Sequence, residues 1–437
     1  MSRDKINIFW FRRDLRLDDN VGFLASLKEE HPVMPIFIFD PEILDNLPED
    51  DARVTFIFET LQDMRNELQE NHHSSIGMYH GKPEEVFKEL LKNYSLGKVF
   101  TNRDYEPYAK DRDEKIQKLL DENNVKFETF KDQVIFEKDE VVKGDGDPYV
   151  VYTPYMKTWM EHFKNSDLKI HYTSQFLDNL VQNTRLPNLS LSDIGFKKSS
   201  LKVPDFDTTP SLIQRYEDTR NIPSKEGTSR LGPHLRFGTV SVRKMVKKAN
   251  NEKNKTFLQE LVWREFFMQV LYHNPSTVTD AFKKKYDNIQ WRNNKEEFEK
   301  WKNGKTGFPL VDAGMRQLNK SGFMHNRVRM LVGSFLCKHL LIDWRWGEAY
   351  FAEKLLDYEM SSNVGNWQWV AGSGVDAVPY FRIFNPTTQI DKFDKDKKYI
   401  KEWVEEFGSD DYPDKMVDHK EARERALSTY KEAVSNG

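Results

Sequence analysis

The tryptophans of this chain gather in its second half, where they alternate with arginines and amides. Eight of the ten tryptophans lie there: Trp263, Trp291, Trp301, Trp344, Trp346, Trp367, Trp369 and Trp403. A tryptophan normally packs in a core, because its ring buries a large area and needs only one hydrogen-bond partner. Segments 260–265 and 363–369 instead set tryptophans beside acidic and amide groups, which need a ligand or a network when buried. The pattern indicates base stacking and electron transfer, with a helical core as the plainer interpretation.

Two residue pairs at helical spacing are candidates for lining one cavity. Glu260 precedes Trp263 by three positions, and Asn326 precedes Met330 by four, so each pair shares one helix face. Packing alone explains Trp263 and Met330. It does not explain Glu260, because a carboxylate is costly to bury without a partner.

Thr228 and Ser229 come directly before a predicted helix. Exposed N–H groups at a helix N-terminus favour anions, so this segment could bind a pyrophosphate. The plainer interpretation is an ordinary helix cap.

These side chains need a scaffold, and the first part of the chain predicts a parallel sheet. Short β-rich runs at 6–10, 33–39 and 98–101 alternate with helical stretches at 54–69 and 83–91. Such alternation is typical of a doubly wound α/β domain. Polar residues follow the strands, at Asp40 and at 101–107, which is the edge where such sheets bind ligands.

The second half predicts helices. Residues 166–207 are rich in Asn, Ser, Asp and Lys and read as a connecting segment, and beyond them apolar residues recur at helical spacing. We therefore expect an α/β domain at 1–130, a connector at 131–207 and an all-α domain at 208–437.

Composition narrows the class of protein. The chain has 437 residues, 38% hydrophobic and 31% charged, with a net charge of −4, so any DNA contact must be a local basic patch. We find neither a zinc-type cluster nor a Walker loop, and Cys337 is the single cysteine. No apolar run reaches membrane-spanning length, so we expect a cytoplasmic protein.

Six motifs carry a family resemblance. They are 227–233 (GTSRLGP), 263–266 (WREF), 307–318 (GFPLVDAGMRQL), 324–330 (MHNRVRM), Asp343-Trp344 and 381–386 (FRIFNP). In this order they resemble the photolyase and cryptochrome family, and most closely its class I cyclobutane pyrimidine dimer (CPD) photolyases. So many ordered motifs are far more specific than a single short pattern.

The resemblance implies an FAD cofactor, reduced in the active form, in the all-α domain. The matching positions are Tyr216, Thr228, Ser229, Arg230, Leu231, Gly232, Asn326, Arg329, Asp357, Glu359 and Asn363. Of these, Asn363 is expected to face the flavin N5, and Arg329 with Asp357 to form a buried pair beside the ring. The family pattern of two aspartates around a glycine reads Asp357-Tyr358-Glu359 here, so its third position carries a longer acid.

The resemblance also implies residues for the substrate and for electron transfer. A flipped-out dimer is expected to meet Glu260, Trp263, Asn326, Met330 and Trp369, with Asn363 beside the flavin. Trp367, Trp344 and Trp291 match the tryptophans that carry electrons to an oxidised flavin. Candidates for phosphate contacts are Arg264, Arg327, Arg382 and Lys392.

The implied activity is light-dependent DNA repair, in which photoexcited reduced FAD donates an electron to a pyrimidine dimer. A (6-4) photolyase ranks lower, since paired histidines are expected there and this chain reads His325-Asn326. A cryptochrome photoreceptor is the other alternative, although the dimer contacts are retained and no long tail follows. A DNA-binding flavoprotein without photochemistry is the plainest alternative function.

The resemblance further implies that the first domain holds an antenna pigment. Folate-binding members carry an Asn-Glu pair where this chain reads Tyr108-Ala109. A deazaflavin, a second flavin, a folate or an empty site stay open. Damaged DNA is the expected partner, with no protein partner evident and a monomer expected.

Overall fold

The computed structural model describes residues 4–435, which form two compact units built from interleaved stretches. Unit 1 contains the residues up to Glu140 together with Glu161–Phe206 and Leu231–Asn251. Unit 2 contains Val141–Met160, Asp207–Arg230 and the residues from Glu252 onward. These units are defined by contacts, whereas the ranges 1–130, 131–207 and 208–437 rest on sequence character, so the domain boundaries stay a prediction.

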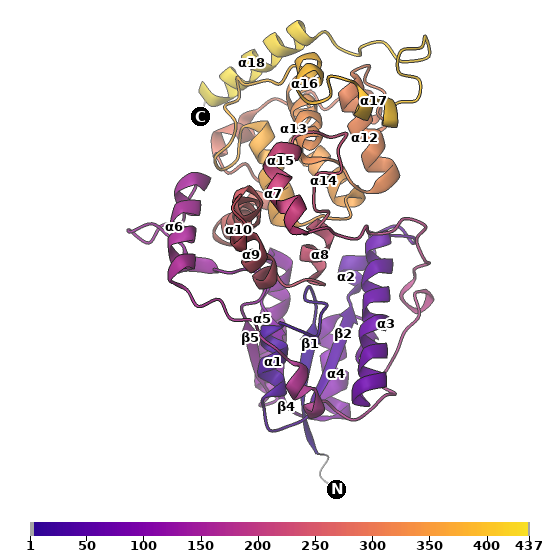
Figure 1. The fold of residues 1–437 in the computed structure, drawn as a ribbon, viewed down its shortest axis with the longest axis vertical. Helices are drawn as coiled ribbons and strands as arrows, with labels where there is room; N and C mark the ends of the chain where they lie inside the picture. Colours follow the sequence, from indigo (N-terminus) through magenta and orange to yellow (C-terminus); the bar gives the residue numbers. More distant parts are fainter. Residues whose placement is uncertain (1–3, 436–437) are drawn as a thin grey trace. The chain divides into compact units, whose positions relative to one another are not determined.

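Unit 1 is built on one parallel sheet of five strands in the order β3-β2-β1-β4-β5 (Figure 1). The strands are β1 (Lys5–Phe11), β2 (Val33–Phe39), β3 (Gly77–His80), β4 (Ser95–Asn102) and β5 (Lys126–Phe130). All seven residues of β2 are buried, as expected of a parallel strand covered on both faces. The predicted parallel sheet is confirmed.

Helices cover both faces of the sheet. They are α1 (Val21–Leu27), α3 (Ala52–His72), α4 (Pro83–Asn93) and α5 (Pro107–Glu122). Phe9 and Phe11 of β1 pack in one core with α1 and α3, while the alternate residues Ile8 and Trp10 pack in another with α4 and α5. This alternation is the strand period of two, and it makes the domain doubly wound, as predicted.

Buried ion pairs attach α9 (Val242–Asn251) to the loops that follow β1 and β5 in unit 1. Arg243 donates to Asp19 Oδ1 at 3.0 Å and to Asp132 Oδ1 at 2.8 Å. Asp132 also accepts from Arg16 at 2.6 Å. Burial alone would raise the pKa of Asp132, but Arg16 and Arg243 hold that pKa below its ordinary value.

Unit 2 is helical, as predicted for the second half. Its main helices are α7 (Pro210–Thr219), α10 (Thr256–His273), α11 (Lys295–Lys302), α12 (Pro309–Ser321), α13 (Asn326–Ser334), α14 (Trp344–Lys354), α15 (Met360–Ala371), α16 (Pro386–Phe393), α17 (Lys398–Trp403) and α18 (His419–Ser435). A π-helical turn, η6 (Phe335–His339), follows α13 directly. The largest core of unit 2 contains Trp301, Trp344 and Trp367.

The described part of the chain contains no helix long and apolar enough to cross a membrane. Between residues 4 and 435 no cluster of three or more His, Cys, Asp or Glu side chains could hold a metal ion.

Candidate cofactor and substrate site

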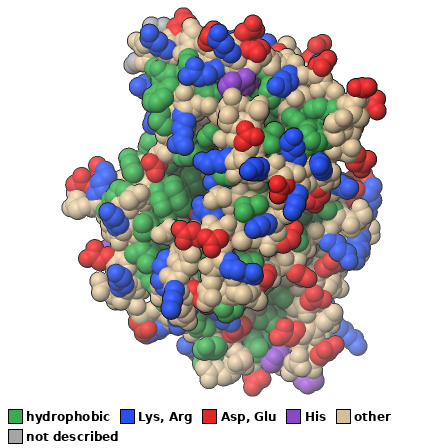
Figure 2. All heavy atoms as spheres, turned by 45° about the horizontal axis from the view of Figure 1, so that its top comes forward, with side chains coloured by type: hydrophobic (Ala, Val, Ile, Leu, Met, Phe, Trp, Pro, Cys, Tyr) green, Lys and Arg blue, Asp and Glu red, His purple; other side chains and the backbone are tan. Residues whose placement is uncertain are grey.

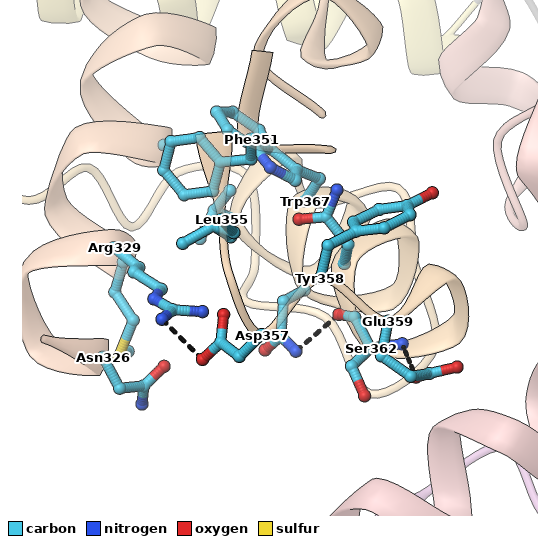
Figure 3. A pocket seen from close by; sticks show the side chains of 14 residues that line it. Asn326, Arg329, Phe351, Leu355, Asp357, Tyr358, Glu359, Ser362 and Trp367 are labelled. Carbon is cyan, nitrogen blue, oxygen red and sulfur yellow. Dashed lines mark hydrogen bonds and ion pairs between the residues drawn. The ribbon is translucent and has the colours of Figure 1, made fainter. Parts of the chain in front are cut away.

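A pocket of about 560 Å³ opens in unit 2 between α13, α14 and α15 (Figure 3). The predicted residues that line it are Asn326, Arg329, Met330, Asp357, Glu359, Asn363 and Trp367. Apolar walls come from Phe351, Leu355 and Val370. The structure therefore brings together residues predicted for the flavin ring, the substrate and the electron path.

Arg329 and Asp357 form an ion pair at the pocket, as predicted, although both side chains are partly rather than fully buried. The guanidinium Nη2 lies 2.9 Å from Asp357 Oδ2 (Figure 3). Nε donates to the Met324 carbonyl at 2.7 Å. The second carboxylate oxygen, Oδ1, is buried and has no hydrogen-bond partner among residues 4–435. A buried acceptor without a partner is costly, so this oxygen suits a donor on a bound ligand.

Asn363 is held by a glutamate that the sequence did not single out. Its amide nitrogen donates to Glu348 Oε1 at 2.8 Å and to the Glu348 carbonyl at 3.1 Å. Both N–H groups are then in use, so the side-chain oxygen is the group available to a ligand. Burial raises the pKa of the Glu348 carboxyl above its ordinary value, against the opposing effect of the hydrogen bond.

Glu359 lines the pocket, but its carboxylate caps α15. Oε2 accepts from the backbone N–H of Ser362 at 2.9 Å and from the Ser361 hydroxyl at 2.6 Å, and Oε1 accepts from Ser361 N–H at 3.3 Å. The longer acid is therefore engaged with the first turn of the helix. Its cap starts the helix that carries Asn363 and Trp367.

The segment predicted to bind a diphosphate is divided between the two units. Tyr216 on α7 belongs to unit 2, with Thr228, Ser229 and Arg230, whereas Leu231 and Gly232 belong to unit 1 at the start of α8 (Gly232–Phe237). Arg230 has a φ of +55°, a left-handed conformation that is uncommon for a residue with a Cβ. Its guanidinium lies 3.6 Å from the centre of the Phe323 ring.

Glu260 and Trp263 of α10 each have a close partner in unit 2. Glu260 forms an ion pair with Arg220, which offsets the free-energy cost of partly burying its carboxylate. Trp263 stacks on Tyr152 with ring centres 3.6 Å apart. Trp369 lies on α15, partly exposed.

The candidate phosphate contacts differ in exposure. Arg382 and Lys392 are exposed and Arg264 is half-buried. Arg327 is partly buried, donating to Asn221 Oδ1 at 2.5 Å and lying 4.6 Å from the Phe393 ring centre. Lys and Arg side chains lie beside a hollow with hydrophobic walls on the face drawn in Figure 2.

The three predicted electron-transfer tryptophans all belong to unit 2. Trp367 and Trp344 are buried in its main core, and Trp291 is partly buried against it. Trp367 reaches the pocket and also meets Trp301 edge to face at 6.2 Å. Trp291 meets Tyr430 edge to face at 6.0 Å.

Sequence reasoning missed Arg220, Glu348 and Tyr152. Glu348 lies beside Gly347 on α14, and an acid flanked by aromatic residues needs a partner where it is shielded from water, which was the available signal. Arg220 and Tyr152 precede their partners by 40 and 111 positions. No local spacing could have joined them.

Unit 1 has its own pocket, of about 850 Å³, at the carboxyl ends of the strands. Trp10, Phe37 and Phe39 supply aromatic walls, and Tyr108 donates to Asp40 at the rim. The lining arginines are paired with acids: Arg12 with Asp113, Arg13 with Asp104 and Glu106, and Arg236 with Glu106.

Comparisons with known proteins match both parts of the chain. The family model described as "DNA photolyase" matches residues 7–173, and the model described as "FAD binding domain of DNA photolyase" matches residues 257–410. A deoxyribodipyrimidine photo-lyase of Halobacterium salinarum is 35% identical, covering 98% of this chain and 99% of the relative. The Escherichia coli protein of the same name is 32% identical, covering 98% of each.

Three solved structures share the fold. A class III photolyase from Agrobacterium tumefaciens has a TM-score of 0.87 at 31% identity, covering 100% of this chain and 99% of its own. A photolyase from Sulfolobus tokodaii with two FAD molecules has a TM-score of 0.83 at 34% identity, covering 98% and 99%. A Synechocystis cryptochrome, at 24% identity over 98% and 99%, matches in fold with a TM-score of 0.85.

Proposed function

The chain belongs to the DNA photolyase family, and on this premise we propose that it splits cyclobutane pyrimidine dimers in DNA by electron transfer from photoexcited, reduced FAD. It is a carbon–carbon lyase that repairs DNA in light. One observation carries the proposal: a single pocket in unit 2 joins Asn326 and Met330 with Arg329, Asp357 and Asn363.

The residues at this pocket fit FAD. Asp357 Oδ1 is a buried acceptor without a partner among the described residues, ready for a ligand N–H. Arg329 places a fixed positive charge beside it, which favours a negatively charged ring. Asn363 presents an amide oxygen whose direction is fixed by Glu348. These residues bind and orient the cofactor, while the photochemistry is the cofactor's.

Glu260, Trp263, Asn326, Met330 and Trp369 would hold the extruded dimer. Asn326 and Met330 line the pocket itself, and Asn326 is exposed to incoming DNA. Glu260 hydrogen-bonds the bases in this proposal, and Arg220 keeps its carboxylate in place until the substrate arrives. Extrusion costs less for a damaged pair, because its stacking is already weakened.

The unit 1 pocket would hold a second, light-harvesting chromophore. Its position at the carboxyl edge of the sheet is the usual ligand site of this fold. Its aromatic walls suit a planar ring, while Arg12, Arg13 and Arg236 already pair with carboxylates. A flavin or deazaflavin ring fits this chemistry, and absorption spectra of pigments released from the purified protein test it.

Damaged DNA is the partner in this proposal. We propose further that the protein acts as a monomer in the cytoplasm. Sedimentation with and without DNA tests whether it is a monomer.

Photorepair is the decisive test. Purified protein with reduced flavin is incubated with oligonucleotides that carry either a cyclobutane dimer or a (6-4) product, in blue light and in darkness. Light-dependent loss of the cyclobutane dimer alone supports the proposal. Repair of only the (6-4) product would mean that this product, and not the cyclobutane dimer, is the substrate. Repair of neither would favour a cryptochrome-type photoreceptor, the alternative function considered from the sequence.

A further inference from the structure

Tyr152 lies flat on the indole of Trp263. The two ring centres are 3.6 Å apart and the planes differ by 9°. Tyr152 opens α6 (Tyr152–Asn165) and is only 7% exposed, whereas Trp263 is partly exposed on α10, one turn after Glu260. One face of a candidate substrate-binding ring is therefore covered before any DNA arrives.

Three contacts fix the tyrosine itself. Its hydroxyl donates to the Gln259 carbonyl at 2.8 Å, and its backbone N–H donates to Asp376 Oδ2 at 3.2 Å. Its ring meets Phe266 edge to face at 5.9 Å. The hydroxyl contact reaches Gln259, the residue next to Glu260. Tyr152 therefore fixes the position of α6 relative to the turn of α10 that carries both Glu260 and Trp263.

Trp263 is also confined by Phe267, whose ring centre lies 5.5 Å away at 28°. Phe267 in turn fits against Gly365 of α15, where an added Cβ would overlap the phenyl ring. The indole plane is thus set by three elements that are far apart in sequence. A side chain immobilised in advance loses little freedom when a ligand binds, which raises affinity.

We propose that Tyr152 is a positioning residue that sets the preference of this enzyme for dimer-containing over undamaged DNA, by holding the Trp263 plane. The inference rests on the proposed function. Undamaged DNA does not enter the pocket and meets mainly the phosphate contacts, so its affinity is independent of the Trp263 ring. The dimer packs against that ring, so its affinity depends on the ring's orientation.

The test is binding of the FAD-loaded enzyme in darkness, which measures recognition without repair. Dissociation constants are measured for one oligonucleotide with a single cyclobutane thymine dimer and for the same oligonucleotide undamaged. Tyr152→Leu removes the ring, and Tyr152→Phe keeps the ring but loses the hydroxyl. We expect about a tenfold loss of dimer affinity for Tyr152→Leu, about twofold or less for Tyr152→Phe, and unchanged affinity for undamaged DNA in both.

Tyr155→Leu is the matched control. Tyr155 lies on the same helix, is also buried and packs on Phe266 at 5.1 Å, so this variant loses core packing without uncovering Trp263. A loss of dimer affinity in Tyr155→Leu as large as in Tyr152→Leu would overturn the inference. So would an unchanged ratio of the two affinities in Tyr152→Leu.

A second variant keeps the inference testable if Tyr152→Leu does not fold. Asp376 is exposed and has a φ of +45°, so Asp376→Gly suits the backbone and removes the acceptor of the Tyr152 N–H. We expect a smaller loss of dimer affinity, about threefold, with undamaged DNA unaffected. Equal affinities here and in the wild type would count against the inference. A wild-type enzyme without any dimer preference would instead refute the proposed function.

Discussion

Asp357 divides two tasks between its carboxylate oxygens. One oxygen accepts from Arg329, and the other is buried at the pocket without a partner in residues 4–435. A neutral side chain of the same shape would weaken the ion pair and replace half of the acceptor capacity with a donor.

We expect Asp357→Asn to retain about a tenth or less of the wild-type affinity for FAD, since hydrogen bonds to charged groups contribute roughly 1.5–3 kcal/mol. The ratio of flavin absorbance to protein in dialysed samples measures it. Asp411→Asn, at an exposed position, is the control and should retain normal flavin. Equal flavin content in Asp357→Asn would remove this residue from the cofactor site.

The predicted electron path separates two activities at the level of one side chain. Trp344 is buried in the core of unit 2 and does not line the pocket, whereas Trp367 does. Trp344→Phe should therefore slow photoreduction of oxidised flavin at least tenfold, and leave repair after chemical reduction unchanged. Transient absorption after a blue flash measures the first, and dimer loss the second.

Trp346→Phe, on the same helix, serves as the control for this path. If Trp344→Phe photoreduces normally while Trp346→Phe does not, the electron follows the alternative branch, in which Trp346 contacts Phe298 at 5.2 Å.

At the scale of elements, α14 and α15 approach so closely that only glycine fits between them. A Cβ on Gly347 of α14 would overlap the ring of Trp367 on α15 and press on Leu336. The contact explains why a glycine sits inside a helix, where it is otherwise destabilising.

We expect Gly347→Ala to lower the free energy of unfolding by about 1–3 kcal/mol, the usual effect of overpacking a filled core. It should also displace Trp367 and slow photoreduction. Urea denaturation measures the stability, and Ala349→Ser at an exposed position of α14 should change it little. Unchanged stability in Gly347→Ala would mean that the two helices separate freely.

The π-helical turn η6 and helix α18 share a histidine contact, in which His339 is buried and His419 is partly exposed. His339 Nε2 lies 2.8 Å from His419 Nδ1. Burial, followed by His419, Arg425 and Lys338, lowers the pKa of His339 from 6.5 to about 3. The unfolded chain therefore takes up a proton below pH 6.5 that the folded chain refuses.

Stability from His339 is present above pH 6.5 and is lost as the pH falls from 6.5 toward 3, by up to ~1.4 kcal/mol per pH unit. His339→Phe removes this proton uptake. Between pH 7 and 5 the variant should therefore lose less unfolding free energy than the wild type, by up to about 2 kcal/mol. Denaturant titrations at both pH values measure it, with exposed His80→Gln as the control. Parallel acid limbs for wild type and His339→Phe would contradict the shifted pKa.

Which elements could be predicted depends on how local their determinants are. β1 and β2 contain continuous apolar runs, β4 contains the β-forming pair Val99-Phe100, and α3 and α4 contain regular helical periods, so all five were predicted to within a few residues. The short β3 and the half-buried β5 carry no such run and were not predicted. The sequence predicted the pocket residues through motif resemblance, but not the partners of Glu260, Asn363 and Trp263, because tertiary contacts select those partners.

At the scale of the whole molecule, DNA binding must work against a net charge of −4. Attraction to phosphates would then depend on a local group of cations, for which we propose the exposed Arg382 and Lys392. Affinity for dimer DNA should fall steeply between low and moderate salt, because cations released from DNA drive binding.

Replacing Arg382 or Lys392 by Gln should each reduce the slope of log affinity against log salt by about 1, without changing the preference for dimers. Fluorescence anisotropy over a salt series measures the slope. A wild-type affinity independent of salt would exclude phosphate contacts, and an unchanged slope would exclude the residue replaced.

The ion pairs of Arg243 also determine when unit 1 can complete its fold during synthesis of the chain. Asp132 and Arg243 are 111 residues apart. A ribosome adding ~5–20 residues per second needs roughly 6–22 s to cover that distance. During this interval all five strands of unit 1 have been synthesised, but Arg243, which pairs with Asp19, has not. Unit 1 therefore reaches its final fold only after the helix at 242–251 has left the ribosome, when more than half of the protein has already been made.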